Sequence, residues 1–328
     1  MSTIRQPLPD ALAADMAALM EAVAAETGPL PDPTLLAPGE GRALSERLNR
    51  RWNVDLPAMA ATAEVTLPAD PNLGSAAVRM RVLVPDGAAA GALLFVHGGG
   101  FAFCSPESHE RCARVLAVES GLAVLVPDYR LAPEHPFPAG LKDVVASLRA
   151  GVAASAPAGV RPGPLVVAGD SAGANLALAA ILAEQAAGNP APAGALLLYG
   201  VYGADFETPS YRQFADGPGL TRGKMQRYWD WYVADTAARA DPLVAPLAAS
   251  DTALAALPPL HLMAAGIDPL LSDTLALTQR LAALGRPETV RVVPGVVHGF
   301  LQMTVALDQA RAALAAAGAA AREMIAAG

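Results

Sequence analysis

The sequence predicts an α/β fold in which a mostly parallel sheet is flanked by helices. From about residue 61 onward, short apolar runs alternate with longer segments of helical periodicity. Most of these runs are almost wholly apolar, as expected for strands buried on both faces of a parallel sheet. Hydrophobic residues make up 53% of the 328 residues, which is enough for a sizeable core. Strands that alternate with helices favour βαβ units with right-handed crossovers.

The expected strands begin with "AEVTLPA" (63–69). The next segment, "AVRMRVLVP" (77–85), alternates apolar residues with Arg79 and Arg81, which is typical of a half-exposed edge strand. Six short apolar runs follow, at 92–96, 123–127, 165–168, 195–199, 260–265 and 290–293. Helical patterns lie between most of them, at 106–120, 138–155, 172–187, 272–284 and 303–326.

Residues 1 to about 55 differ from this alternation. Leu12, Met16, Leu19 and Val23 recur at helical spacing, and Gly28 ends the pattern. A proline-rich connector (28–41) leads to a second short helix, "LSERLNRRWN" (44–53). Two such helices need an apolar surface to pack on. They either pack on the main domain alone or also cover a pocket.

A second departure spans residues 204 to about 257, where no convincing strand is found. We interpret it as an insertion at the C-terminal edge of the sheet. Met225, Tyr228, Trp229 and Tyr232 share one face of a helix there. This aromatic face either packs in the core or forms the wall of a lid that contacts substrate.

Charge and cysteine content exclude several classes of function. The net charge is −8 and the longest basic run is Arg50-Arg51, so no nucleic-acid partner is expected. Cys104 and Cys112 indicate neither a disulfide framework nor a metal site, although Cys104 lies near a glycine motif and a reactive thiol there is the alternative. No signal peptide or membrane anchor is indicated, so a cytoplasmic location is expected.

The strongest local motif is Gly169-Asp170-Ser171-Ala172-Gly173, a G-x-S-x-G pattern between an apolar run and a helical segment. Glycines on both sides allow a strained turn that exposes a nucleophilic serine. The following helix directs free N–H groups toward developing negative charge. Ser171 is therefore the candidate nucleophile, with Gly169, Asp170 and Gly173 supporting the turn.

A serine nucleophile needs a general base, and in the order Ser, acid, His the base follows the serine. Only His261 and His298 follow Ser171. His261 lies inside an apolar strand pattern, whereas His298 comes a few residues after the last expected strand, on a loop. Asp268, directly after a buried run, is the preferred acid, and Asp273 is its competitor in the first turn of the next helix.

The run His97-Gly98-Gly99-Gly100-Phe101 directly follows an expected strand. Its glycines allow the backbone to approach a substrate and to present N–H groups to a tetrahedral oxyanion. His97 is expected to order this loop by hydrogen bonding. A phosphate-binding loop is the alternative, but neither a following Lys-Ser/Thr nor G-x-G-x-x-G is present.

Five motifs together resemble the hormone-sensitive-lipase-like (bacterial family IV) carboxylesterases of the α/β-hydrolase superfamily. They are "HGGGF", "PDYRLAPEHPFPAGLKD", "GDSAGAN", "DPLLSD" and "HGF", in this order between about residues 60 and 310. The resemblance implies an α/β-hydrolase fold whose eight-stranded, mostly parallel sheet occupies a catalytic domain (56–328). It also implies a helical cap, made of residues 1–55 and an insertion at about 204–240.

The same resemblance implies roles for individual residues. Ser171, Asp268 and His298 would be the catalytic triad, and the N–H groups of Gly99, Gly100 and Ala172 the oxyanion hole. Asp128, Arg130 and Glu134 would be scaffold residues, and Ala174 departs from the glycine that is common in the family.

The sequence thus predicts a serine carboxylesterase that acts on short-to-medium-chain acyl esters. No cofactor or metal is expected, and the expected partner is a small-molecule ester, with a homodimer allowed by the resemblance. An amidase, lactonase or formamidase with the same triad is the first alternative. A non-catalytic ligand receptor on this fold is the second, but such a protein would be expected to lose a triad member.

Overall fold

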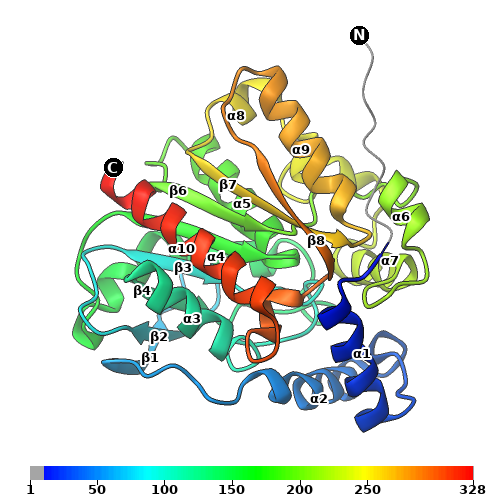
Figure 1. Ribbon diagram of the computed structural model, residues 1–328. Coiled ribbons are helices and arrows are strands. Elements are labelled where there is room, and N and C mark those ends of the chain that lie inside the picture. The colour runs from blue at the N-terminus through cyan, green and yellow to red at the C-terminus, as the bar shows by residue number, and fades with distance from the viewer. Residues whose placement is uncertain (1–10, 328) are drawn as a thin grey trace.

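One sheet forms the centre of the molecule in the computed structural model, which describes residues 11–327 (Figure 1). Within these residues eight strands pair in the order β1-β2-β4-β3-β5-β6-β7-β8. The strands are β1 (Ala61–Leu67), β2 (Val78–Val84), β3 (Ala92–Val96), β4 (Ala123–Pro127), β5 (Leu165–Asp170), β6 (Gly194–Leu198), β7 (Leu260–Ile267) and β8 (Val290–Val297). β3 to β8 are parallel, whereas β1 and β2 pair antiparallel. The predicted α/β fold with a mostly parallel sheet is confirmed.

The prediction of an edge position for β2 was wrong, because β2 lies between β1 and β4. Its polar alternation has a different cause. Arg79 donates to the carboxylates of Glu107 and Asp128, and Arg81 binds Glu110. One row of the strand thus forms ion pairs instead of facing open water, and β1 is the edge strand on this side of the sheet.

Helices cover both faces of the sheet. α3 (Glu110–Ser120) and α10 (Asp308–Ala327) pack on one face. α4 (Ala139–Ala154), α5 (Ala172–Ala186) and α9 (Leu271–Ala283) pack on the other. All five lie in predicted helical segments, although α3 begins at 110 instead of 106 and α10 at 308 instead of 303.

β8 extends four residues beyond the predicted strand, through Pro294 and Gly295 to Val297. Proline is tolerated here because β8 is at the edge of the sheet, where a missing N–H leaves no ladder partner unsatisfied. A register shift between Ala265 and Ile267 of β7 accommodates the irregularity. His298 therefore lies in a turn that follows the end of the strand directly, whereas a gap of a few residues between strand and histidine was expected.

The N-terminal segment contains α1 (Ala14–Thr27), a 3₁₀ helix (Pro33–Leu35), α2 (Pro38–Asn49) and a second 3₁₀ helix (Arg50–Trp52). α2 begins six residues before the predicted start. Pro38 occupies its first turn, where no intrahelical N–H bond is lost, and Gly41 packs so closely that a Cβ would lie 2.3 Å from the Pro33 carbonyl oxygen. Residues 1–10 of the predicted cap segment lie outside the described residues.

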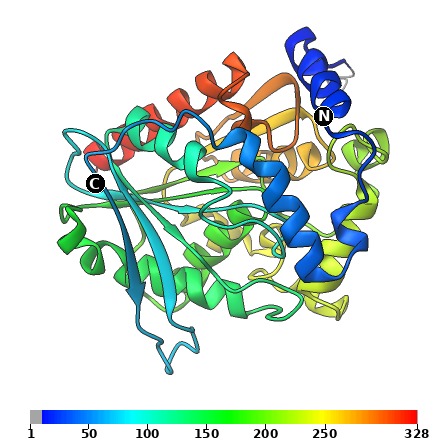
Figure 2. The same cartoon turned by 90° about the horizontal axis from the view of Figure 1, so that it is seen from below.

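The stretch from 204 to 257 contains α6 (Pro209–Gln213), α7 (Arg222–Tyr232), α8 (Asp251–Ala255) and 3₁₀ helices at Ala237–Ala240 and Pro246–Ala248. α7 lies beside the N-terminal segment (Figure 2), and Arg227 of α7 binds Asp32 at 2.5 Å and Thr34 at 2.6 Å. Both segments lie at the end of the sheet toward which β7 and β8 run (Figure 1).

The motif "PDYRLAPEHPFPA" is held by ion pairs. Asp128 binds Arg79 at 2.9 Å, Arg130 binds Asp143 at 2.8 Å, and Glu134 binds Arg42 of α2. Arg42 also donates to the backbone carbonyl oxygens of Ala102 and Ala132. Its guanidinium therefore ties α2 both to this motif and to the loop that follows β3. None of the helices within residues 11–327 combines the length and the apolar character that crossing a membrane requires.

Candidate active site

Ser171 lies on a sharp turn between the end of β5 and the start of α5. Its backbone is in a rarely populated region, with φ 55° and ψ −121°. A Cβ at Gly169 would lie 2.3 Å from the Gly173 carbonyl oxygen, and one at Gly173 would lie 2.0 Å from that of Val96. Only glycine fits at both positions. The turn thus brings the serine hydroxyl to the C-terminal end of the sheet.

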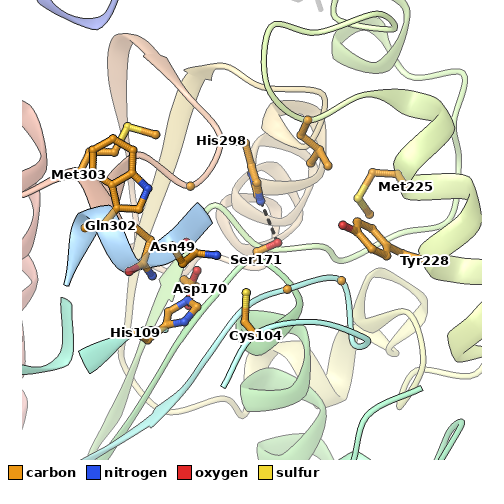
Figure 3. Close-up of a pocket in the computed structure, with 15 residues that line it drawn as sticks. Asn49, Cys104, His109, Asp170, Ser171, Met225, Tyr228, His298, Gln302 and Met303 are labelled. Atoms are coloured by element: carbon orange, nitrogen blue, oxygen red, sulfur yellow. Dashed lines mark hydrogen bonds and ion pairs between the residues drawn. The ribbon is translucent and has the colours of Figure 1, made fainter. Parts of the chain in front are cut away.

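His298 and Asp268 lie beside Ser171, at the ends of β8 and β7. His298 Nε2 is 2.9 Å from Ser171 Oγ (Figure 3). His298 Nδ1 is 2.6 Å from Asp268 Oδ2. Asp268 is fully buried, and its other oxygen accepts from the Leu270 N–H at 2.8 Å. The carboxylate accepts the Nδ1 proton, so the Nε2 lone pair faces the serine hydroxyl.

Asp273, the competing acid, does not contact His298. Its Oδ2 accepts from the N–H groups of Tyr202 and Gly203 at 2.8 and 2.9 Å. Burial raises the pKa of this carboxyl to about 7, and the hydrogen bonds from the two N–H groups offset only part of this increase. Asp273 therefore holds the chain after β6 in place and lies outside the Ser171–His298–Asp268 contacts.

The Asp273 carboxyl predicts a pH-dependent stability. Its pKa is about 7 in the folded chain and near 3.8 when unfolded, so between these values the folded state binds more protons. This group therefore lowers the unfolding free energy as the pH rises from about 4 to above 7, by roughly 2–4 kcal/mol. Asp273→Asn keeps an oxygen acceptor for both N–H groups and removes the titration. Urea unfolding at pH 5 and pH 8 should show a smaller decrease for the variant than for the wild type, and equal decreases would contradict this role.

The glycines after β3 form a loop next to Ser171. Gly99 and Gly100 have φ values of +117° and +60°, and a Cβ at Gly99 would lie 2.2 Å from the Phe103 carbonyl oxygen. No hydrogen bond within residues 11–327 uses the N–H of Gly99, Gly100 or Ala172 as donor. These three donors, all close to the nucleophile turn in sequence or space, are thus available to a substrate oxygen.

His97 orders the first part of this loop. Its Nδ1 is 2.8 Å from the Gly98 carbonyl oxygen, and its ring stacks on Tyr129 with 4.4 Å between centroids. The Tyr129 hydroxyl donates to the His97 carbonyl oxygen at 2.8 Å. Burial, with His109 nearby, lowers the pKa of His97 to about 3, so the ring stays neutral at ordinary pH.

Asp170 links the loop to two residues that sequence reasoning did not assign to the site. Its Oδ1 accepts from the Gly98 N–H at 2.8 Å and lies 3.4 Å from His109 Nε2. Its Oδ2 is 3.4 Å from the Tyr199 hydroxyl, and the Tyr199 ring packs edge-on against His298 at 4.9 Å. Burial alone would raise the pKa of Asp170, but His109 and the Gly98 N–H more than offset it and lower the pKa. No sequence spacing signals these contacts, which arise only when three strand ends meet.

A cavity of about 250 Å³ opens above Ser171. In Figure 3, Asn49, Gln302 and Met303 lie on one side of Ser171, and Met225 and Tyr228 on the other. The cavity is lined by Asn49, Trp52, Gly99, Gly100, Cys104, His109, Asp170, Ser171, Leu220, Met225, Tyr228, His298, Gly299, Gln302 and Met303. The N-terminal segment and the 204–257 stretch thus both contribute residues to the cavity wall. On the aromatic face of α7, Met225 and Tyr228 line the cavity, whereas Trp229 and Tyr232 are buried in the core.

Comparisons with known proteins agree with this arrangement. Residues 93–302 match a family described by the alpha/beta hydrolase fold. The chain belongs to this family. It is 35% identical to carboxylesterase NlhH of Mycobacterium tuberculosis over 222 residues, and this match covers 66% of this chain and 69% of NlhH. It is 36% identical to esterase LipI of the same species over 220 residues, and this match covers 66% of this chain and 68% of LipI.

Solved structures of esterases are similar to this α/β-hydrolase over nearly its whole length. A thermostable esterase from Pseudomonas putida has a TM-score of 0.86 and 31% identity, and the match covers 98% of both chains. An ester hydrolase from the metagenome of Lake Arreo has a TM-score of 0.86 and 33% identity, covering 95% of this chain and 98% of the other. The predicted family resemblance is confirmed, and the chain is a carboxylic ester hydrolase.

Cys104, the candidate reactive thiol of the sequence, lines the cavity and has a left-handed backbone with φ 69°. Burial raises the pKa of its thiol to about 12. At neutral pH the sulfur is therefore a protonated thiol, which is a weak nucleophile. This favours the interpretation of Cys104 as part of the cavity wall of the hydrolase.

Proposed function

We propose that this α/β-hydrolase cleaves short-to-medium-chain acyl esters through an acyl-enzyme intermediate on Ser171. One observation carries the proposal: the unbroken series of contacts from Ser171 Oγ through the two nitrogens of His298 to the buried carboxylate of Asp268. This series has the donor and acceptor order that a serine nucleophile requires.

In the first half of the reaction, Ser171 Oγ attacks the ester carbonyl carbon and His298 Nε2 takes the hydroxyl proton. The carbonyl oxygen becomes an oxyanion, which the N–H groups of Gly99, Gly100 and Ala172 stabilise. The bond to the alcohol oxygen then breaks, and His298 gives its proton to the departing alcohol. Asp268 stabilises the imidazolium that exists between these proton transfers.

In the second half, a water molecule attacks the acyl carbon while His298 takes one of its protons. The same N–H groups stabilise the second oxyanion. The bond to Ser171 Oγ breaks, the carboxylic acid leaves, and the proton returns from His298 to the serine oxygen. No step in this sequence requires a metal ion or an organic cofactor.

The size of the cavity supports a small substrate. About 250 Å³ lies below the usual range for sites that hold drug-sized ligands. We propose that residues 11–55 and the insertion at about 204–240 act as a cap that sets this size, because Asn49, Trp52, Met225 and Tyr228 come from these segments. A homodimer, which the family resemblance allows, stays a prediction.

A series of p-nitrophenyl esters from acetyl to palmitoyl tests the proposal. We expect kcat/KM to be highest between about two and eight acyl carbons and to fall steeply beyond, because longer chains exceed the cavity. Parallel assays with anilides and lactones measure the competing activities. A preference for insoluble long-chain esters would overturn the substrate class, and faster anilide than ester hydrolysis would overturn the reaction.

A further inference from the structure

Tyr228 of α7 lies against the glycine loop beside Ser171. A Cβ at Gly100 would lie 2.4 to 2.5 Å from three atoms of the Tyr228 ring, so the ring covers that glycine directly. The ring also meets Phe103 edge-on at 5.7 Å and Trp231 at 6.3 Å. These contacts fix the direction in which the phenol extends.

The Tyr228 hydroxyl extends into the cavity. In Figure 3 its oxygen is at the end of the ring nearer Ser171, on the side of the cavity where Met225 also lies. Among residues 11–327 no hydrogen bond to this hydroxyl is formed, and neighbouring Leu220 and Met225 offer no strong acceptor. Burial raises the pKa of Tyr228 above its usual value, so the hydroxyl remains a neutral donor. A cavity-facing donor without a partner in the chain is suited to a substrate acceptor.

The direction of the hydroxyl selects one part of the substrate. In the proposed mechanism the alcohol oxygen must face His298, which contacts Ser171 from a different side in Figure 3. The carbonyl oxygen faces the N–H groups of Gly99 and Gly100, beneath the Tyr228 ring. The atoms left to face the hydroxyl are therefore those of the acyl chain close to the carbonyl carbon.

We propose that Tyr228 is a specificity-determining residue, whose hydroxyl donates a hydrogen bond to an oxygen on the acyl chain next to the scissile carbonyl. Among short acyl esters, those of 2-alkoxy or 2-oxo acids are therefore preferred over plain fatty acyl esters of the same size. This proposal rests on the proposed esterase function and on the orientation of the substrate that it implies.

A matched substrate pair isolates this hydrogen bond. p-Nitrophenyl methoxyacetate and p-nitrophenyl butyrate have the same number of heavy atoms and differ by one oxygen in place of a methylene. The ratio of their kcat/KM values, divided by the ratio of their hydroxide-catalysed rates, removes the difference in chemical reactivity. A neutral hydrogen bond corresponds to a change of about three- to tenfold in this ratio.

Tyr228→Phe removes the hydroxyl and keeps the ring over Gly100. We expect it to lower the normalised ratio about three- to tenfold, so kcat/KM should fall more for the methoxyacetate than for the butyrate. Tyr211→Phe is the matched control, since Tyr211 is buried outside the cavity and its hydroxyl has no partner within residues 11–327. This control should leave the ratio unchanged, and circular dichroism melting curves establish that both variants fold.

An unchanged ratio in Tyr228→Phe would overturn the proposal, as would an equal decrease for both esters, because that pattern belongs to a residue that only shapes the site. Failure of the esterase function itself gives a different result. In that case the wild type hydrolyses neither ester, or Ser171→Ala hydrolyses both at the wild-type rate.

Discussion

Ser171→Ala is expected to lower kcat for p-nitrophenyl butyrate by roughly 10⁵- to 10⁶-fold. The hydroxyl is the atom that His298 Nε2 contacts at 2.9 Å, and alanine leaves the base without a nucleophile to activate. The residual rate then comes from substrate binding and from the N–H groups of the glycine loop. Initial rates with purified protein, at enzyme concentrations high enough to detect slow turnover, measure the effect.

A second serine provides the control for Ser171→Ala. Ser250 is exposed and accepts a hydrogen bond from the Ala253 N–H at the start of α8, away from the cavity. Ser250→Ala should cost about 1 kcal/mol of unfolding free energy as a lost helix cap and leave kcat unchanged. Retention of even one tenth of the wild-type activity by Ser171→Ala, after removal of contaminating esterases, would show that another group is the nucleophile.

Local sequence was sufficient to predict the sharp turn at Ser171. Steric demands at a strand-to-helix turn are set by neighbours in the chain, and Gly169 and Gly173 record those demands directly in the sequence. The strands were predictable for a similar reason, because burial on both faces leaves only apolar side chains. Where a strand is irregular this argument fails: Pro294 and Gly295 interrupt the apolar run, yet the edge position of β8 allows the strand to continue to Val297.

Contacts that depend on how strand ends meet could not be predicted. Asp170 was expected to support the turn, but its partners His109 and Tyr199 lie 61 and 29 residues away in the chain. The alternation of apolar residues places each side chain on a face of its own element and says nothing about distances between elements. Tyr228 illustrates both cases: its helix face was predicted, whereas its position over Gly100 depends on how α7 packs against the loop after β3.

Asp268→Asn is expected to lower kcat about 10⁴-fold with little change in KM. The asparagine amide N–H cannot accept the proton on His298 Nδ1, so the imidazole is forced into the tautomer that carries its proton on Nε2. That proton then faces Ser171 Oγ, where the wild-type ring offers a lone pair at 2.9 Å. The substituted side chain still has an oxygen that can accept from the Leu270 N–H, so the fold of the β7 end should persist.

Comparing Asp268→Asn with Asp273→Asn tests which of the two candidate acids supports His298. Both carboxyls are buried, follow β7 within six residues and accept backbone N–H groups, and asparagine keeps an oxygen acceptor at either position. Only Asp268 contacts His298, and therefore Asp273→Asn should keep kcat within about threefold of the wild type. A large loss of kcat in both variants, with both proteins shown to be folded at the assay temperature, would mean that the two carboxyls act together on His298 and that the buried Asp268 carboxylate alone does not determine the tautomer.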